Sequence, residues 1–102
     1  MSSAPLSNSE SNFKIVKNDS FNNSMIEFAK MTILFAFSEL KDNFYKMCEF
    51  VSLKFEEKYG GNWGSSIIKE GDSCFVYIDF CLTMKYKDYI IKINKLKWLI
   101  YF

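Results

Sequence analysis

Residues 54–68, KFEEKYGGNWGSSII, divide the chain into a helical part and a strand-rich part. Phe55 and Tyr59 lie four positions apart in a charged stretch, which is the spacing of one face of a helix. Gly60 follows as a residue that ends a helix in the left-handed conformation. Trp63 then heads a stretch that reads as a strand. This junction requires a fold in which helices precede it and most strands follow it.

Two amphipathic helices are predicted before the junction. The first covers about residues 23–40 and the second covers 44–59, each with apolar residues at three- and four-residue steps. Met31, Leu34 and Phe35 lie off the main stripe of the first helix. A helix that is apolar on more than one side is usually buried on more than one side, for instance by a second subunit.

The strands and helices together predict an α+β fold. Two helices pack on one face of a mainly antiparallel sheet, in the order β-α-α-β-β-β-β, because short connections join the later strands. With 102 residues the chain forms one domain. Residues 1–12, rich in Ser and Asn, are predicted to be a disordered tail, and 13–102 to be the folded domain. The predicted strands cover residues 13–17, 63–68, 73–82, 89–93 and 96–102.

The predicted strand 73–82 is apolar on both of its faces. Such a strand needs cover on both sides, and two helices on a small sheet supply cover on one side only. A partner subunit or a bound peptide would supply the rest, so the strand indicates an assembly. Its two faces are Cys74, Val76, Ile78, Phe80 and Leu82, and Phe75, Tyr77, Asp79 and Cys81.

Composition argues against catalysis and against nucleic-acid binding. The chain has no His and its 13 basic residues are all Lys, which removes His-based triads and Arg clamps for phosphate. A net charge of +1 is too small to hold a nucleic acid by bulk charge. No phosphate loop or metal-ligand pattern is present. The sequence therefore predicts a protein that is not an enzyme and that needs no cofactor.

The cysteines and the N-terminal stretch predict a cytosolic protein. Cys48, Cys74 and Cys81 form no C-x-x-C pair and are odd in number, so reduced thiols are expected. The first 12 residues lack the apolar core of a signal peptide. The longest apolar run is far short of a membrane span, so no membrane association is expected.

Several stretches resemble the small dynein light chains of the DYNLL type. IVKN at 15–18 is similar to the first strand of that family, Val-Ile-Lys-Asn. KFEEKYGGNW at 54–63 resembles Glu-Phe-Asp-Lys-Lys-Tyr-Asn-Pro-Thr-Trp, and Ser73 falls on the Ser of Phe-Gly-Ser-Tyr. The resemblance covers about residues 13–102.

The resemblance implies a strand-swapped homodimer that binds other proteins. In that family one strand crosses to the partner's sheet, and short linear motifs add to its outer edge as a further strand. The implied partners are the dynein intermediate chain and other linear-motif proteins. The implied location is the cytoplasm and the cytoskeleton, with the dynein complex or possibly an axoneme.

The same resemblance assigns site residues. Residues 71–77 correspond to the swapped strand, and Trp63 to the start of the strand that meets the partner. The implied peptide groove is Asn18, Gly71, Asp72, Ser73, Cys74, Phe75, Val76 and Tyr77. The implied dimer interface is Trp63, Gly64, Ser65, Ser66, Phe75 and Tyr77.

Departures from the family pattern leave motif selectivity open. Gly71-Asp72 replaces Phe-Gly, and Phe44-Tyr45 stands near the acid–Lys pair of the family's second helix. Gly64 occupies the position of a His that makes the family dimer acid-sensitive, so no acid switch is expected here.

Two other functions remain open from the sequence. Residues 85–97, KYKDYIIKINKLK, carry five Lys. They are either solvated strand faces or a contact for an acidic membrane or polymer in a structural protein with the same fold. An enzyme or small-ligand binder would need convergent polar groups, and the sequence offers none.

Overall fold

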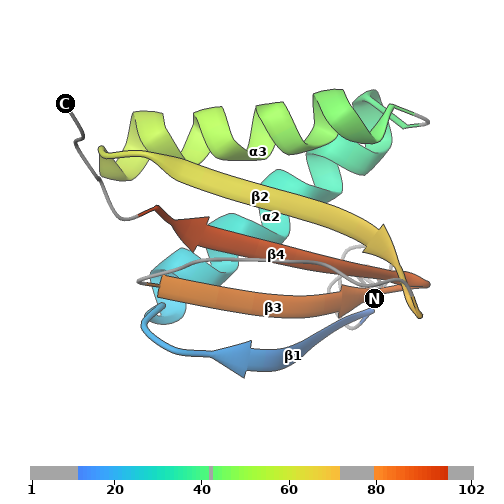
Figure 1. Cartoon of the computed structure of the whole chain (residues 1–102), viewed down its shortest axis with the longest axis horizontal. Coiled ribbons are helices and arrows are strands. Elements are labelled where there is room, and N and C mark those ends of the chain that lie inside the picture. Colours follow the sequence, from blue (N-terminus) through green and yellow to red (C-terminus); the bar gives the residue numbers. More distant parts are fainter. Residues whose placement is uncertain (1–11, 42, 72–79, 97–102) are drawn as a thin grey trace, which may run out of the picture.

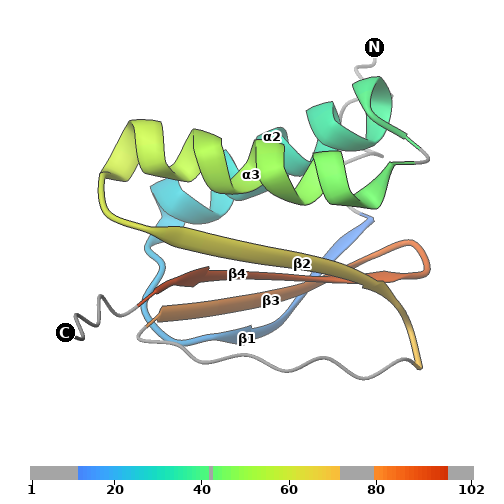
Figure 2. The ribbon, with the colours of Figure 1, turned by 45° about the horizontal axis from the view of Figure 1, so that its top comes forward.

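A computed structural model describes residues 12–41, 43–71 and 80–96 of the chain. Two helices cover one face of a four-stranded sheet (Figures 1 and 2). The sheet order is β1-β3-β4-β2 and every strand pair is antiparallel. The predicted α+β architecture is confirmed. The elements are β1 (Phe13–Asn18), α2 (Asn23–Glu39), α3 (Phe44–Tyr59), β2 (Trp63–Lys69), β3 (Phe80–Tyr86) and β4 (Tyr89–Lys95).

Side-chain caps fix where both helices begin. The Asn22 side chain accepts a hydrogen bond from the backbone N–H of Met25 at 2.9 Å, and Asn43 accepts one from Lys46 at 3.0 Å. Each cap satisfies a donor that the first helical turn leaves unpaired. Gly60 ends α3, as the sequence predicts, but its φ of 74° and ψ of 170° differ from the predicted left-handed helical conformation. These local signals explain why the predicted bounds of α3 agree with the structure.

The predicted bounds of the third and fourth strands were wrong. β3 extends to Tyr86, so Lys85 and Tyr86 belong to a strand and not to the turn that their polarity suggested. The reason is non-local: the Tyr86 ring stacks on Phe13 across the sheet, with centroids 4.5 Å apart. β4 likewise continues past residue 93 to Lys95, where it pairs with Trp63. Residues 73–79 and 97–102, predicted as strands, and the tail 1–11 lie outside the described residues.

An aromatic cluster forms the junction between helix layer and sheet. Phe55 on α3 is fully buried and contacts the rings of Phe21, Phe28, Tyr59 and Trp63. Trp63 contacts Phe55 of α3, and Tyr86 contacts Phe37 of α2. The sheet face that carries these two residues therefore faces the helices, and we call the opposite side the helix-distal face. Alternation along β2 places Gly64, Ser66 and Ile68 on that face.

The Tyr59 hydroxyl is buried in this cluster and has no hydrogen-bond partner among the described residues. Burial raises the pKa of Tyr59 above its usual 10.0. A buried polar group without a partner costs about 1–3 kcal/mol. Tyr59→Phe is therefore expected to leave the free energy of unfolding unchanged, or to raise it by up to about 1 kcal/mol.

The dependence of stability on alkaline pH gives a further test of the same substitution. Because the folded-state pKa is raised, the unfolded chain loses the Tyr59 proton first, and stability falls as the pH rises past about 10. Between pH 7 and pH 10.5 the free energy of unfolding should fall less in Tyr59→Phe than in the unsubstituted protein, as measured by urea unfolding followed by circular dichroism. A marked destabilisation at pH 7 would mean that the hydroxyl has a partner.

Candidate functional site

The two edge strands of the sheet differ in how well they are protected against further strand pairing. β1 has a register shift between Ile15 and Lys17, and it carries Lys14 and Lys17. A bulge and edge lysines are the usual devices that prevent an edge from pairing. β2 pairs with β4 in unbroken register from Trp63 to Lys69, with no charged residue before the last position. β2 is thus the edge that is suited to accept another strand.

A groove of about 540 Å³ lies between α3 and β2. We call it the α3–β2 groove. Among the described residues, its lining is mostly aromatic, small or hydroxylic, and it includes one carboxylate and no cation. The lining residues are Phe44, Tyr45, Cys48, Glu49, Ser52, Gly64, Ser65, Ser66 and Ile67.

Two polar contacts hold α3 over β2 beneath this groove. The Ser65 hydroxyl donates to the backbone carbonyl of Cys48 at 2.7 Å. Since that proton is committed, the Ser52 hydroxyl, 3.0 Å away, donates to the Ser65 oxygen. The Phe44 ring also contacts Tyr89 of β4, with centroids 5.3 Å apart. The floor of the groove is therefore fixed by contacts within the chain.

The wall near the start of α3 is the exposed, aromatic part of the groove. Tyr45 is 76% exposed and Phe44 is 40% exposed. Large apolar side chains at this level of exposure, next to a strand edge that can pair, indicate a surface for another protein segment.

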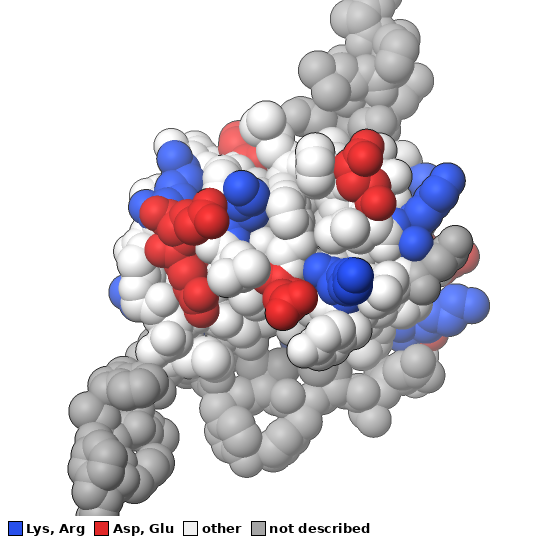
Figure 3. Space-filling model, turned by 90° about the horizontal axis from the view of Figure 1, so that it is seen from above, with Lys and Arg blue, Asp and Glu red and all other residues white. Residues whose placement is uncertain are grey.

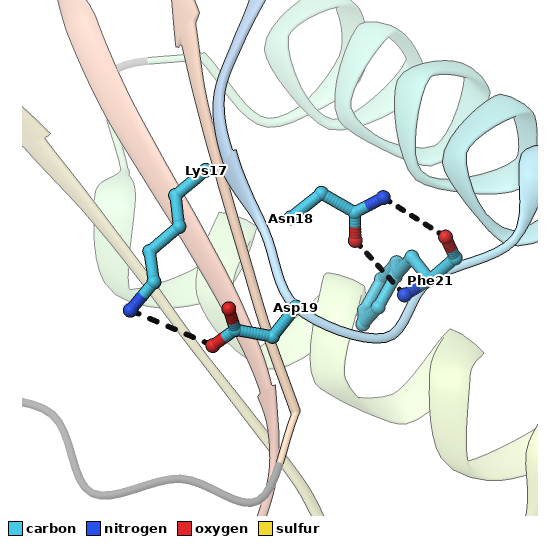
Figure 4. A network of polar contacts seen from close by, with 4 residues as sticks. All are labelled: Lys17, Asn18, Asp19 and Phe21. Carbon is cyan, nitrogen blue, oxygen red and sulfur yellow. Dashed lines mark hydrogen bonds and ion pairs between the residues drawn. The ribbon is translucent and has the colours of Figure 1, made fainter.

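Of the predicted peptide-groove residues, the structure describes only Asn18 and Gly71. Gly71 lies exposed in the turn that follows β2, and residues 72–77 fall outside the described part of the chain. Asn18 ends β1, at the opposite edge of the sheet from β2. Its side-chain amide donates to the carbonyl of Phe21 and its oxygen accepts from the Phe21 N–H, both at 2.9 Å (Figure 4). Asn18 therefore orders the turn that follows β1.

The predicted dimer-interface residues of β2 divide between the two faces of the sheet. Gly64 and Ser66 lie on the helix-distal face, and both line the α3–β2 groove. Trp63 is 4% exposed, and its indole N–H donates to the Gly60 carbonyl at 2.8 Å. The structure thus gives Trp63 a core role and gives Ser65 the contacts to α3 described above. Phe75 and Tyr77 lie outside the described residues.

The helix-distal face also carries a buried polar group. Asn94 stands opposite Gly64 in the β2–β4 register and is 5% exposed. Its side-chain oxygen is buried and has no hydrogen-bond partner in the described ranges. A buried acceptor without a donor is costly, so Asn94 marks a place on this face where a further donor would be stabilising.

Cys48, Glu49 and Ser52 were not predicted to belong to a site. The helical period of residues 44–59 indicates which side chains share a face, and nothing in it indicates which of them face the edge of β2. The run Gly64-Ser65-Ser66 was the available signal, since small residues allow another chain to approach closely.

Charge and metal patterns supply no second site in the described part of the chain. Lys85 forms an ion pair with Glu70 at 2.7 Å, so the predicted Lys-rich hairpin is partly neutralised. Figure 3 shows acidic and basic side chains interspersed on the α3 side of the molecule. No three His, Cys, Asp or Glu side chains in the described ranges gather into a candidate metal site. Neither described helix combines the length and hydropathy needed to cross a bilayer.

Comparison with known proteins shows similarity at the level of fold. No family model and no curated protein matches the chain. Two structures of the dynein light chain-like domain of the Fasciola hepatica calcium binding protein FhCaBP2 superpose with TM-scores of 0.69 and 0.70, at 14% and 13% identity. They cover 85% and 83% of this chain, and 94% and 91% of their own.

The dynein light chain-like domain of CsTAL3 gives a TM-score of 0.66 at 10% identity, and covers 82% of this chain and 92% of its own. The chain therefore has a dynein light chain-like fold.

Proposed function

We propose that this chain is a non-catalytic homodimeric protein that binds short linear motifs by strand addition. The observation that supports this function best is the unprotected edge of β2 beside the α3–β2 groove. Edge strands without a bulge or charge tend to pair with another chain. The dynein light chain-like fold and the resemblance of residues 15–18 and 54–63 to dynein light chains agree with this function.

In the proposed dimer, residues 71–77 of one copy pair with β2 of the other. The added strand lies along Gly64 and Ser66 and fills the side of the groove nearest to β2. Polar groups of the second copy would satisfy the buried oxygen of Asn94 on the helix-distal face. The exchange is reciprocal, so each dimer has two equivalent sites.

A linear motif would then add to the outer edge of the swapped strand, against Phe44 and Tyr45. Backbone hydrogen bonds give tolerance of sequence, and alternate side chains give selectivity. The aromatic wall favours apolar motif residues. A seven- or eight-residue motif spans about 25 Å, and two sites raise the avidity for a two-chain partner by about 10²–10⁴.

The proposed partners follow from the resemblance to dynein light chains. They are the dynein intermediate chain and other linear-motif proteins, in the cytoplasm and on the cytoskeleton. The chain would act there as a hub that holds two partner chains together.

Light scattering of the purified chain at several concentrations, with and without a dynein intermediate-chain peptide, tests the proposal. We expect a mass of about twice 12.0 kDa and two peptides per dimer. The alkylation rate of Cys48, read by peptide mass mapping, should fall when peptide is added, because Cys48 lines the groove. Exposed Met31 lies outside the groove, so Met31→Cys supplies a thiol whose rate should not change. A monomer at all concentrations would contradict the proposal.

The proposed dimer is expected to be insensitive to mild acid. The chain contains no His, and His is the side chain whose ordinary pKa lies in this range. The mass from light scattering should be the same at pH 7 and pH 5.5. Dissociation of the dimer with an unchanged circular dichroism spectrum would show that another group titrates at the interface.

A further inference from the structure

The side of the helix layer that faces away from the sheet carries a patch of exposed apolar side chains. Met31 and Phe35 of α2 are 65% and 52% exposed, and Leu53 of α3 is 50% exposed. Phe50 of α3 joins them, because its ring stacks on Phe35 with centroids 5.1 Å apart. These side chains do not line the α3–β2 groove, so the strand exchange proposed at β2 leaves the patch uncovered.

On α3 this patch belongs to a stripe of side chains separated by steps of four, three and four residues. The stripe is Lys46, Phe50, Leu53 and Glu57, and we call it the outer stripe. Such steps bring side chains to one face of a helix, in the pattern of a two-helix coiled coil. The two apolar members lie in the middle, and an exposed charged member lies at each end. Figure 3 looks onto this side of the molecule and shows uncharged surface between charged side chains.

The outer stripe is symmetrical about the midpoint of α3. The helix runs from residue 44 to residue 59, so its midpoint falls between the two apolar members. If two copies of α3 lie antiparallel with their midpoints together, Phe50 of one copy lies opposite Leu53 of the other. Lys46 then lies opposite Glu57, and a twofold axis repeats each of these contacts. The two helices overlap along their full length of about 24 Å.

The charges favour this arrangement over the parallel one. In a parallel pair Lys46 would face Lys46 of the second copy, and Glu57 would face Glu57, so both ends would repel. In the antiparallel pair opposite charges meet at both ends, and charge complementarity of this kind selects the partner and its register. A second copy of the chain supplies the required order of one cation, two apolar side chains and one carboxylate by symmetry.

The contact is expected to be weaker than the strand exchange. Its centre consists of the two apolar layers, and its ion pairs are exposed to water, where they add little to affinity. Lys54 lies at one flank of the stripe and pairs with Glu57 of its own helix at 3.4 Å. Because equivalent flanks meet in an antiparallel pair, Lys54 of each copy approaches the other. Small contacts with a charged rim belong to the transient class.

We propose that a second copy of this chain docks on the outer stripe through an antiparallel pair of α3 helices. The inference goes beyond the proposed function, since the outer stripe shares no residue with β2 or with the lining of the α3–β2 groove. Two exchange dimers joined in this way double the number of motif-binding sites in one assembly. The pair therefore clusters the hub when its local concentration is high.

Charge reversal tests the register of the pair. Lys46→Glu and Glu57→Lys should each weaken the association at least about 10-fold, because each replaces both attractive end contacts with repulsive ones. An equimolar mixture of the two variants should associate like the unsubstituted chain, since every acidic position then faces a basic one. Both variants should fold. Lys46→Glu places an acid in the first turn of α3 and Glu57→Lys places a cation in the last, and the helix dipole favours both.

Light scattering at protein concentrations up to about 1 mM, which detects a Kd of that size, measures the association. The mass of the unsubstituted chain should rise above twice 12.0 kDa with concentration, and that of either single variant should stay at twice 12.0 kDa. Lys14→Glu makes the same charge change on β1, outside α3, and is the matched control that should behave like the unsubstituted chain. Circular dichroism checks that each variant is folded.

The outcomes separate this inference from the proposed function. A mass that stays at twice 12.0 kDa at every concentration, in the unsubstituted chain and in both variants, would overturn the α3 pair and leave the strand exchange standing. Association that grows with concentration and ignores both charge reversals would assign it to another surface, and would also overturn the inference. A dimer that Lys46→Glu converts to a monomer would support the α3 pair and contradict exchange at β2.

Discussion

Trp63→Ala is expected to lower the free energy of unfolding by about 3–5 kcal/mol, the range for removing a large aromatic side chain from a core. Trp63 is 4% exposed and contacts the rings of Phe21, Phe55 and Tyr59. The substitution opens a cavity at the junction of α3 and β2. It also removes the indole N–H that donates to the Gly60 carbonyl at 2.8 Å.

Urea unfolding followed by circular dichroism measures this effect. Trp63→Phe should cost less, since it retains most ring contacts and loses the hydrogen bond. Tyr45→Ala is a control at a 76% exposed aromatic, where a change within about 0.5 kcal/mol is expected. A loss below about 1 kcal/mol for Trp63→Ala would show that Trp63 does not support the core.

Ile68→Lys is expected to weaken the proposed dimer at least about 100-fold, or about 2.8 kcal/mol at 1.4 kcal/mol per tenfold. Ile68 lies on the helix-distal face of β2, opposite Ile90 of β4. A strand added to β2 would place its side chains beside Ile68, where an unpaired charge is costly. The substitution also gives β2 the type of edge lysine that β1 already has.

Val16→Lys is the matched control for this prediction. Val16 is a β-branched residue on the other edge strand, is 56% exposed, and lies where the register of β1 shifts. It should leave the dimer unchanged. Light scattering across a dilution series measures both variants, with circular dichroism to show that the fold is retained. Equal dimer stability in the two variants would contradict strand addition at β2.

The helices were predictable from the sequence because their signals are local. Asn43 caps α3 through Lys46, three residues away, and Gly60 ends the same helix. The bounds of β3 were not predictable in this way. Lys85-Tyr86 has the polarity of a turn, and only the stacking of Tyr86 on Phe13, far away in sequence, places it in a strand.

The candidate site was predictable only in part. Gly64, Ser65 and Ser66 were named from the sequence as dimer-interface residues, and all three line the α3–β2 groove. Cys48, Glu49 and Ser52 were missed as groove residues because the helical period shows which residues share a face, and not which element that face meets.

The sequence by itself determined the order and type of the elements, the ends of α3 and the absence of His. These depend on residue identity and on contacts within a few positions of the chain. Only the tertiary structure decided which strand lies at which edge, because β2 becomes an edge through its pairing with β4, about 25 residues later in the chain. The groove follows from that same pairing and from the bond between Ser65 and the Cys48 carbonyl. A surface made by distant segments has no signature in any one of them.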